Sequence, residues 1–199
     1  MEILLATNNR HKVEEISYLL NSHFPSVSIR SLLEFPSFPP VEETEPTLEG
    51  NALKKARAGY EASGILTIAD DTGLECYYLG LEPGVFSARY AGEGATYADN
   101  NRKLLKTLKG VAARRRTARF RSVVAIAGTG YQKLVEGSVE GRILESPRGS
   151  EGFGYDPLFV PNGGVKTYAE MMLEEKNTLS HRAMALRKAI EALKNISLE

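Results

Sequence analysis

Residues 65–73 read Ile-Leu-Thr-Ile-Ala-Asp-Asp-Thr-Gly, and this stretch decides the class of fold. Its first five residues form an apolar run of the length expected for a buried strand. The preceding segment has Thr47 as a capping residue, apolar residues at helical spacing and Ser63-Gly64 at its end, which together predict a helix. The strand runs into two carboxylates before a predicted turn. Ligands of α/β proteins collect at such strand ends, so an α/β fold with a site near Asp70 and Asp71 is expected.

The beginning of the chain repeats the combination of strand and helix. Residues 2–6 predict a short buried strand, and the apolar residues from Val13 to Leu20 have helical spacing. The turn between them, residues 7–12, places capping residues and a lysine where the backbone N–H groups of a helix start would point. This turn is a candidate anion site, and an ordinary helix cap with an exposed lysine is the alternative. Residues 34–46 hold four prolines and four glutamates and predict a long loop.

The second half of the chain predicts a mixed sheet. A helix is expected from Thr96 to a stop at Gly110, with its inward residues at Tyr97, Asn101, Leu104, Leu105 and Leu108. Two strands, about 118–128 and 131–140, are joined by Gly128-Thr129-Gly130, which indicates a hairpin. A short strand is expected at 158–160, a short helix from Thr167, and a last helix from Ser180.

Composition excludes several classes of protein. The chain has 199 residues, 25 Lys plus Arg against 25 Asp plus Glu, 42% apolar residues and one cysteine. Such a chain can bury a core, and neither a disulfide framework nor a global attraction to polyanions is expected. No apolar stretch approaches the roughly 20 residues that span a bilayer, and the N-terminus lacks a signal-peptide pattern. We expect one two-lobed domain over residues 1–199, located in the cytoplasm, with neither nucleic acid nor membrane as partner.

Several local patterns allow two interpretations. Arg114-Arg115-Arg116 with Arg119 and Arg121 is either a nucleic-acid contact or, as the zero net charge favours, a solvated surface. Asp70-Asp71 is either a solvated turn or part of a site, and neighbouring strand residues point in opposite directions, so the two aspartates need not share a role. Sequence motifs for a P-loop, a dinucleotide fold or a zinc protease are absent. A hard, oxygen-ligated metal remains possible, with the loop glutamates and Asp70-Asp71 as the densest acidic groups.

The order of these segments resembles the inosine triphosphate pyrophosphatase family, also called non-canonical purine nucleoside triphosphate pyrophosphatases. The resemblance extends over nearly the whole chain. The matching segments are Thr7-Asn8-Asn9-Arg10-His11-Lys12, Glu42-Glu43-Thr44, residues 51–56, residues 69–74, residues 83–90, residues 152–157, Glu175-Lys176-Asn177 and Ser180-His181-Arg182. One position departs from the family, which usually has Glu where this chain has Gly50. That residue is at the third helical position after Thr47, so a capping-box glutamate is missing at a cost of about 1 kcal/mol.

The resemblance implies a long twisted mixed sheet with flanking helices and two lobes around a central nucleotide-binding cleft. It further implies a magnesium-dependent homodimer that hydrolyses ITP, dITP and XTP to the monophosphate and pyrophosphate, which removes deaminated purines from the nucleotide pool. Two alternatives stay open. One is a house-cleaning pyrophosphatase for other modified nucleotides, and the other is a nucleotide-binding protein without catalysis.

The resemblance also assigns roles to residues of this chain. Asp71 would ligate Mg²⁺ and orient or deprotonate the attacking water, Glu42 would be the second carboxylate on the metal, and Asp70 would support them. Phe153 would stack on the purine, while Lys176, His181 and Arg182 would donate to its edge. The full set of expected substrate contacts comprises Thr7, Asn8, Asn9, Arg10, His11, Lys12, Lys55, Thr72, Phe153, Gly154, Tyr155, Asp156, Lys176, His181 and Arg182.

Overall fold

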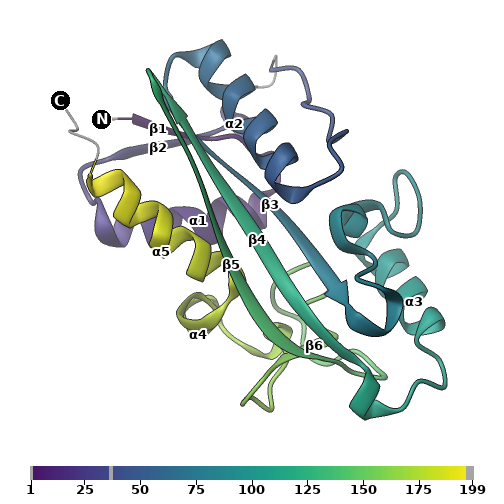
Figure 1. The fold of residues 1–199 in the computed structure, drawn as a ribbon. Helices are drawn as coiled ribbons and strands as arrows, with labels where there is room; N and C mark the ends of the chain where they lie inside the picture. The colour runs from purple at the N-terminus through teal and green to yellow at the C-terminus, as the bar shows by residue number, and fades with distance from the viewer. Residues whose placement is uncertain (1, 36–37, 196–199) are drawn as a thin grey trace. The chain divides into compact units, whose positions relative to one another are not determined.

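The computed structural model of the protein describes residues 2–35 and 38–195 (Figure 1). Its strands are β1 (Glu2–Leu5), β2 (Ser28–Ser31), β3 (Leu66–Cys76), β4 (Thr117–Gly128), β5 (Tyr131–Ile143) and β6 (Phe159–Pro161). Its α-helices are α1 (Arg10–His23), α2 (Leu48–Ser63), α3 (Tyr97–Thr107), α4 (Leu173–Leu179) and α5 (His181–Lys194). No helix within the described ranges is long and apolar enough to cross a membrane.

One mixed sheet contains all the described strands, in the order β2-β1-β3-β4-β5-β6. Strand β1 runs parallel to both β2 and β3, whereas β5 and β6 are antiparallel. The hairpin expected at Gly128-Thr129-Gly130 joins β4 to β5, where Gly130 has φ 63. The α/β class and the mixed sheet are therefore confirmed.

The described chain forms two compact units, neither of which is continuous in sequence. The first unit contains the residues up to Asp71, Ser122–Gly137 and the residues from Arg182 onward. The second unit contains Thr72–Arg121 and Ser138–His181. The boundary cuts strand β3 between Asp71 and Thr72, strand β4 between Arg121 and Ser122, and strand β5 between Gly137 and Ser138.

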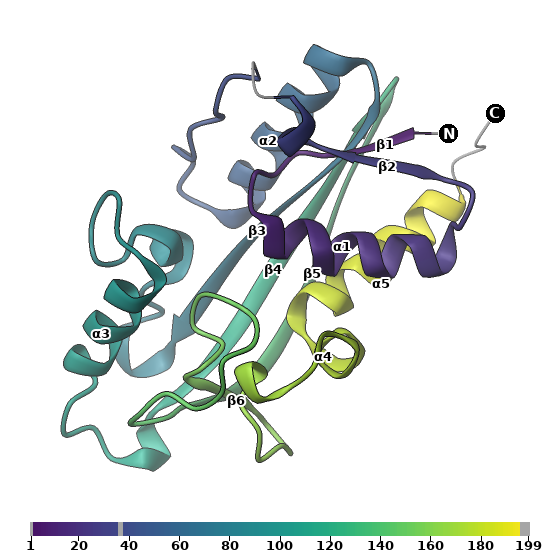
Figure 2. The same cartoon turned by 180° about the vertical axis from the view of Figure 1, so that it is seen from behind.

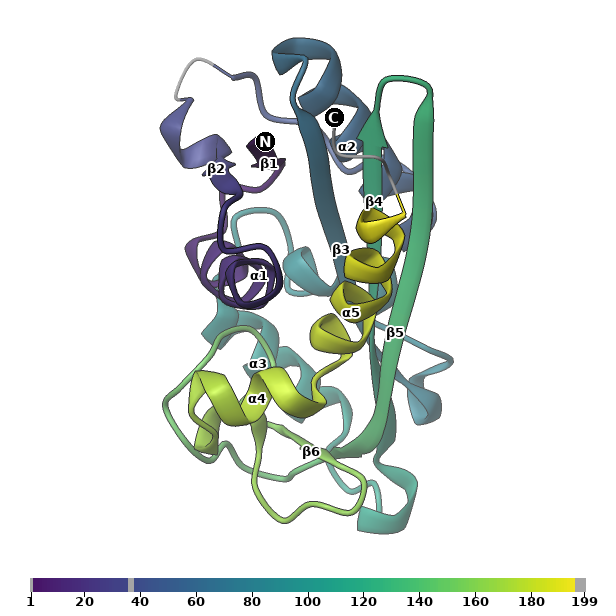
Figure 3. The ribbon, with the colours of Figure 1, turned by 90° about the vertical axis from the view of Figure 1, so that its left-hand side faces the viewer.

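Helices cover both faces of the sheet in the first unit. The side chains of Ile3, Leu5 and Ile68 share a core with the apolar faces of α1 and α5, which lie together on one side in Figures 2 and 3. Helix α2 packs on the opposite face, because a Cβ on its Gly59 would lie 2.7 Å from Thr67 Cγ2 and 3.3 Å from Ala6 Cβ. Strand residues alternate between faces, so both layers are fixed by the same short apolar strands.

Helix α2 begins where the sequence predicts, but Gly50 has a role that the sequence did not indicate. Thr47 Oγ1 accepts a hydrogen bond from the Gly50 N–H at 3.1 Å, as expected for the N-cap. Asn51 then holds the preceding turn, since its Oδ1 accepts from Glu45 N at 3.0 Å and its Nδ2 donates to Glu45 O at 3.3 Å. A Cβ at position 50 would lie 2.7 Å from Glu45 Cβ. Gly50 therefore makes room for this turn.

This packing predicts that Gly50→Ala brings none of the usual gain of about 1 kcal/mol from replacing a helical glycine. The new methyl group would displace the Glu45 turn, so we expect the free energy of unfolding to stay unchanged or to fall. Chemical denaturation measures it. Ala58→Gly in the middle of the same helix is the matched control and should destabilise by about 1 kcal/mol. A clear stabilisation by Gly50→Ala would show that Glu45 is not held as described.

The second unit has its own core, which contains several aromatic residues. Phe120 of β4 and Phe159 of β6 pack edge to face with ring centroids 4.8 Å apart, and Tyr168 lies against both rings. Leu104 of α3 and Leu108, the C-cap residue of that helix, belong to the same core. Cys76 is buried here as a free thiol, and burial raises its pKa to about 12.

The expected turn at Asp70-Asp71 is wrong. Strand β3 continues through both aspartates to Cys76, because Leu74 and Cys76 belong to the core of the second unit. Gly73 lies against the backbone of Gly84, where a Cβ would be 2.6 Å from the Gly84 carbonyl oxygen. Thr72-Gly73 therefore marks a close backbone approach within a strand.

Four further differences from the sequence predictions concern short or exposed segments. Strand β2 was not predicted, since only its pairing with β1 makes the short polar run Ser28–Ser31 extended. The helix expected from Thr167 is a 3-10 turn, Tyr168–Glu170, and α4 follows it separately.

Tyr97 was expected to point inward, but 44% of it is exposed and Asn100 is buried instead. Arg116 does not belong to a solvated basic surface, because it is buried and donates to the carbonyl oxygens of Leu108, Ile143 and Leu144.

Candidate functional site

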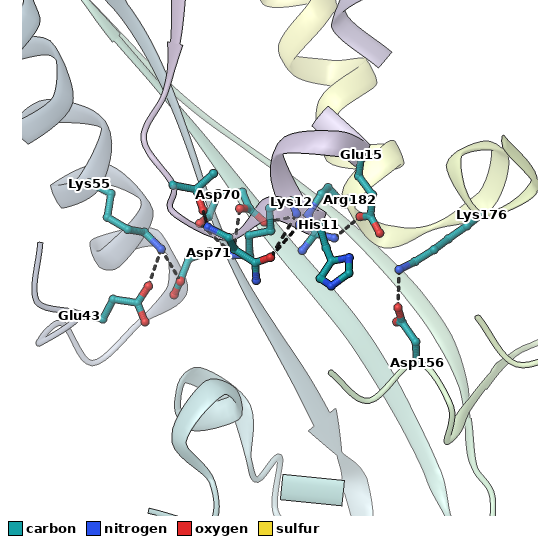
Figure 4. A network of polar contacts seen from close by, with 12 residues as sticks. His11, Lys12, Glu15, Glu43, Lys55, Asp70, Asp71, Asp156, Lys176 and Arg182 are labelled. Atoms are coloured by element: carbon teal, nitrogen blue, oxygen red, sulfur yellow. Dashed lines mark hydrogen bonds and ion pairs between the residues drawn. The ribbon is translucent and has the colours of Figure 1, made fainter. Parts of the chain in front are cut away.

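Asp70 and Asp71 point to opposite faces of β3, as the alternation of strand residues predicts. Asp70 faces α1 and α5, where it contacts Lys12 and Arg182. Asp71 faces α2, where it contacts Lys55. Figure 4 shows both groups of contacts. The two neighbouring carboxylates therefore belong to different networks, both within the first unit.

Asp71, Lys55 and Glu43 form a compact group that we call the Asp71 cluster. Lys55 Nζ lies 2.8 Å from Asp71 Oδ1 and 2.6 Å from Glu43 Oε1. Helix α2 supplies the lysine, strand β3 the aspartate and the loop before α2 the glutamate. One ammonium thus bridges two carboxylates. A cation of higher charge could replace the ammonium beside the carboxylates, and a phosphate group could replace a carboxylate beside the ammonium.

The pKa values of the two carboxylates in the Asp71 cluster are shifted in opposite directions. Burial raises the pKa of Asp71 to about 6, against the opposing effects of Lys55 and Lys12. Burial also acts on Glu43, but there the charge of Lys55 prevails and the pKa lies below its ordinary value. Burial would lower the pKa of Lys55, yet the charges of Asp71 and Glu43 raise it, so the ammonium persists. Asp71 is therefore a group that can exchange a proton near neutral pH, a property typical of functional carboxylates.

Asp70 belongs to a buried network of four charges. Arg182 Nε donates to Asp70 Oδ2 at 3.0 Å, the same guanidinium is paired with Glu15, and Lys12 Nζ lies 2.9 Å from Asp70 Oδ1. Although burial opposes ionisation, the charges of Lys12 and Arg182 hold the pKa of Asp70 far below its ordinary value. Arg182, expected as a donor to the purine edge, is almost completely buried in this network. Glu15 was missed, because nothing in the sequence distinguishes it from Glu14 beside it.

The start of α1 is capped by its own side chains. Asn9 is the N-cap, and its Oδ1 accepts from the backbone N–H groups of His11 at 3.1 Å and Lys12 at 3.4 Å. Thr7 Oγ1 in turn accepts from Asn9 N at 3.2 Å. Asn8, Arg10 and His11 are exposed at this end of the helix. An anion that binds here would compete with the Asn9 cap for these N–H groups, so its binding would depend more on the cationic side chains of Arg10 and Lys12.

The two loop glutamates occupy different environments. Glu42, expected on the metal, is exposed, whereas Glu43 contacts the lysine that Asp71 also contacts. Within the described residues, no group of three or more His, Cys, Asp or Glu side chains converges as a metal site. Two carboxylates do meet at Lys55, and Mg²⁺ is commonly held by one or two carboxylates together with substrate phosphates. The donor set of the Asp71 cluster therefore fits a magnesium ion that arrives with a triphosphate.

In the second unit, Phe153 lies in a turn that a buried ion pair supports. Asp156 Oδ2 accepts from the Phe153 N–H at 2.8 Å and from Lys176 Nζ at 2.5 Å. The Lys176 ammonium lies 5.1 Å from the centroid of the Phe153 ring, within the range of a cation–π contact. Figure 4 shows the pair formed by Lys176 and Asp156. Three residues expected at the purine thus belong to one local structure.

Two other residues expected near the purine are part of the aromatic core of the second unit. His181 is buried and stacks on Phe120, with ring centroids 4.5 Å apart and planes 8° apart. Tyr155 is buried and its hydroxyl donates to Ser87 O at 2.9 Å. Burial raises the pKa of this hydroxyl above its ordinary value, so it stays protonated. Thr72 is the first residue of the second unit.

Comparison with known proteins identifies relatives over the whole chain. A family model described as the Ham1 family matches residues 3–192. A dITP/XTP pyrophosphatase from Thermoanaerobacter sp. (strain X514) is 48% identical over 199 residues, which is 100% of this chain and 98% of the relative. A protein with the same name from Bacillus subtilis (strain 168) is 46% identical over 193 residues and covers 96% of each chain.

Solved structures show the same similarity. A HAM1 protein from Coxiella burnetii has a TM-score of 0.86 and 38% sequence identity, over 98% of both chains. A nucleoside-triphosphatase / dITP/XTP pyrophosphatase from Mycobacterium abscessus has a TM-score of 0.74 and 41% identity, over 98% of this chain and 100% of that one. The similarity therefore extends to sequence and fold together.

Proposed function

The chain belongs to the Ham1 family, and from that premise we propose that it hydrolyses non-canonical purine nucleoside triphosphates, such as ITP, dITP and XTP, to the monophosphate and pyrophosphate. The Asp71 cluster is the observation that carries the proposal. It combines a buried carboxylate whose pKa is raised to about 6 with a lysine that can neutralise phosphate. Hydrolysis of a phosphoanhydride requires both kinds of group.

Lysines of the first unit would bind the triphosphate. Lys12 and Lys55 carry their charges on α1 and α2, and each contacts one of the two neighbouring aspartates of β3. Phosphate oxygens would share these ammonium groups with the carboxylates, and Thr7 and Asn9 could add hydroxyl and amide donors beside Lys12. This neutralisation lowers the cost of bringing a nucleophile to a polyanion.

Asp71 would accept the proton of the attacking water. The water oxygen forms a bond to the α-phosphorus, the bond from the α-phosphorus to the bridging oxygen of the β-phosphate breaks, and pyrophosphate leaves with the bonding electrons. The proton of the water moves to the Asp71 carboxylate, whose pKa of about 6 leaves it ionised at neutral pH and still basic. Lys55 holds this carboxylate at 2.8 Å and fixes its orientation.

Magnesium is part of the proposal as a required cofactor. Asp71, with a second carboxylate from Glu42 or Glu43, would hold the ion, and when bound it would supply Lewis-acid neutralisation of the phosphate oxygens. Glu42→Gln and Glu43→Gln test which glutamate contributes. We expect the variant of the true ligand to raise the half-saturating Mg²⁺ concentration about tenfold and the other to leave it within about twofold. Glu43 lies beside Asp71 here, so Glu43→Gln is expected to have the larger effect. An unchanged Mg²⁺ dependence in both variants would remove the two glutamates from the metal.

The purine would be bound by the second unit, with Phe153 stacked on its face. Hypoxanthine and xanthine carry a keto oxygen at position 6, which accepts hydrogen bonds, whereas adenine carries an amino donor there. Cationic donors such as Lys176 would therefore favour the deaminated bases, because adenine offers them no acceptor at position 6. Arg182 and His181, expected in the same role, would have to act from their buried positions.

The direct test is to incubate the purified protein with dITP and with ATP, each with and without Mg²⁺, and to measure monophosphate and pyrophosphate. We expect Mg²⁺-dependent release of pyrophosphate from dITP, with a kcat/KM at least about a hundredfold above that for ATP. Direct release of orthophosphate, or equal rates for the two nucleotides, would contradict the proposed bond or the proposed base selectivity.

Lys55→Met should change both substrate binding and the pH dependence. Loss of the ammonium leaves Asp71 and Glu43 as two neighbouring carboxylates without the cation that bridges them. Like charges disfavour ionisation, so the pKa of Asp71 should rise above about 6 and the acid limb of the kcat/KM profile should move to higher pH. KM for dITP should rise about tenfold or more, because a phosphate contact is lost. Lys54→Met, at the preceding residue, is the control and should leave both quantities unchanged.

A homodimer in the cytoplasm completes the proposal. Size-exclusion chromatography with light scattering tests the oligomeric state, for which we expect twice the chain mass of 21.8 kDa.

A further inference from the structure

The purine proposal depends on how Phe153 is held, and its loop has an unusual backbone. We define the base loop as residues 152–156. Gly152 and Gly154, on either side of Phe153, have φ 68 and φ 62, the left-handed region that favours glycine. A Cβ on Gly152 would lie 2.1 Å from Asp156 Oδ2. The backbone on both sides of Phe153 is therefore tightly turned, and its conformation depends on hydrogen bonds to nearby side chains.

One support comes from within the unit core. Asp156 holds the Phe153 N–H, and Lys176 holds Asp156, while the Tyr155 hydroxyl donates to Ser87 O. These bonds fix the backbone before Phe153 and the residues after Gly154. They leave the Gly154 carbonyl, the group that follows Phe153 directly, to another element.

That element is α3. Asn101 Nδ2 donates to Gly154 O at 2.9 Å, across 53 positions of sequence. Tyr97, four residues earlier and so on the same face of the helix, has its ring 5.8 Å from that of Phe153 at an angle of 47°. Among the described residues, Asn101 Oδ1 is buried without a hydrogen-bond partner. The bond to Gly154 therefore sets the orientation of the amide, since the flipped amide would face oxygen with oxygen.

Helix α3 is itself anchored independently of the base loop. Thr96 and Asp99 form a capping box at its start. The next asparagine, Asn100, holds a different segment, since its Oδ1 accepts from Ala91 N at 2.7 Å and its Nδ2 donates to Ala88 O at 3.0 Å. Neighbouring residues thus have separate functions: Asn100 fixes the helix to its own unit, and Asn101 reaches the loop that carries Phe153.

We propose that Asn101 is a positioning residue for the nucleobase: by holding the Gly154 carbonyl, it fixes the Phe153 ring beside Tyr97 in the orientation that stacks on a purine. The proposal rests on the proposed function, in which Phe153 contacts the base. Asn101 acts through the base loop and not on the phosphate chain, whose proposed ligands Lys12 and Lys55 belong to the other unit. Its substitution should therefore weaken ligands that carry a purine and spare those that do not.

The test compares dITP with inorganic tripolyphosphate, which has the phosphate chain without a base. Asn101→Asp removes the donor and places a carboxylate against the Gly154 carbonyl, and Asn101→Leu removes the bond with similar side-chain size. We expect both variants to raise KM for dITP about three- to tenfold, with kcat and the inhibition constant of tripolyphosphate within about twofold of the original protein. Thermal unfolding of each variant shows that the fold is kept, and the second variant replaces the first if one fails to fold.

A double-mutant cycle separates positioning from a general structural effect. In a Phe153→Ala background, Asn101→Asp should not raise KM for dITP further, because Asn101 acts through that ring. Additive effects on KM, or equal weakening of dITP and tripolyphosphate, would overturn the proposal. If Phe153→Ala alone leaves KM for dITP unchanged, the assignment of the base to Phe153 fails, and with it the premise. If dITP is not hydrolysed at all, the proposed function fails. These results are therefore distinguishable.

Discussion

In Asp71→Asn, kcat with dITP and Mg²⁺ is expected to fall by about 10²- to 10⁴-fold while the protein keeps its fold. Asparagine has the shape of aspartate and can still accept a hydrogen bond from Lys55, which lies 2.8 Å from Asp71 Oδ1. It cannot accept a proton from water, and it is a poorer ligand for Mg²⁺ than a carboxylate. Steady-state kinetics with circular dichroism on the same sample measure both parts of the prediction.

The pH dependence of the original protein and of Asp71→Asn gives this prediction a second readout. Burial raises the pKa of Asp71 from its ordinary value of 3.8 to about 6, so the folded chain binds the proton more tightly than the unfolded chain does. The contribution of this carboxyl to stability is complete below about pH 4 and is lost as the pH rises through 6. Asp71→Asn should remove that part of the pH dependence and should not lower the stability at pH 7.

Activity depends on pH in the opposite sense. The free enzyme needs ionised Asp71 to accept the proton, so kcat/KM should fall as the pH drops below about 6. Asp70→Asn is not a suitable control, because Asp70 supports the fold, but Glu61→Gln changes an exposed carboxylate of the same unit and should leave rate and profile unchanged. An Asp71→Asn variant with undiminished turnover would show that another group accepts the proton.

The parts of the fold that the sequence predicted are those in which local signals agree. Thr47, the helical spacing after it and Gly64 predict α2, and the structure has Leu48–Ser63 with Gly64 in the left-handed conformation. Residues 128–130 likewise predict the hairpin between β4 and β5. In each case the capping or turn residue determines the backbone locally, so no knowledge of distant contacts is needed.

The parts that were missed depend on contacts between distant segments. Strand β3 continues past Asp71 because Leu74 and Cys76 pack in a core formed with residues far away in sequence. The Asp-Asp-Thr-Gly pattern alone favours a turn. Glu43 and Glu42 are indistinguishable until Lys55 is placed beside one of them. The same holds for Glu15, whose burial is explained only by the position of Arg182 on the last helix. A sequence pattern identifies the type of residue that a site needs, while the packing of helices on the sheet selects the individual residue.

Removing Asp70 should have the largest effect on stability. Arg182 is almost completely buried and is held by Asp70 and Glu15, and Lys12 pairs with Asp70 as well, so two cations and two anions balance in this network. Asp70→Asn leaves one buried positive charge uncompensated, which costs about 3–5 kcal/mol of unfolding free energy. Urea denaturation at pH 7 measures this loss. Glu191→Gln, which breaks the exposed pair with Lys194, is the matched control and should cost less than about 1 kcal/mol.

Two further measurements identify the cause as the uncompensated charge. In Asp70→Asn/Arg182→Met both partners are absent, so the loss should be smaller than the sum of the two single variants by about 1–3 kcal/mol. Because Lys12 and Arg182 hold the pKa of Asp70 far below its ordinary value, this carboxylate stabilises the fold above about pH 4 and its contribution is lost as the pH falls further. Stability should therefore decline less steeply in acid for Asp70→Asn than for the original protein. A loss no larger than that of Glu191→Gln, or strict additivity with Arg182→Met, would mean that the four charges do not act as one network.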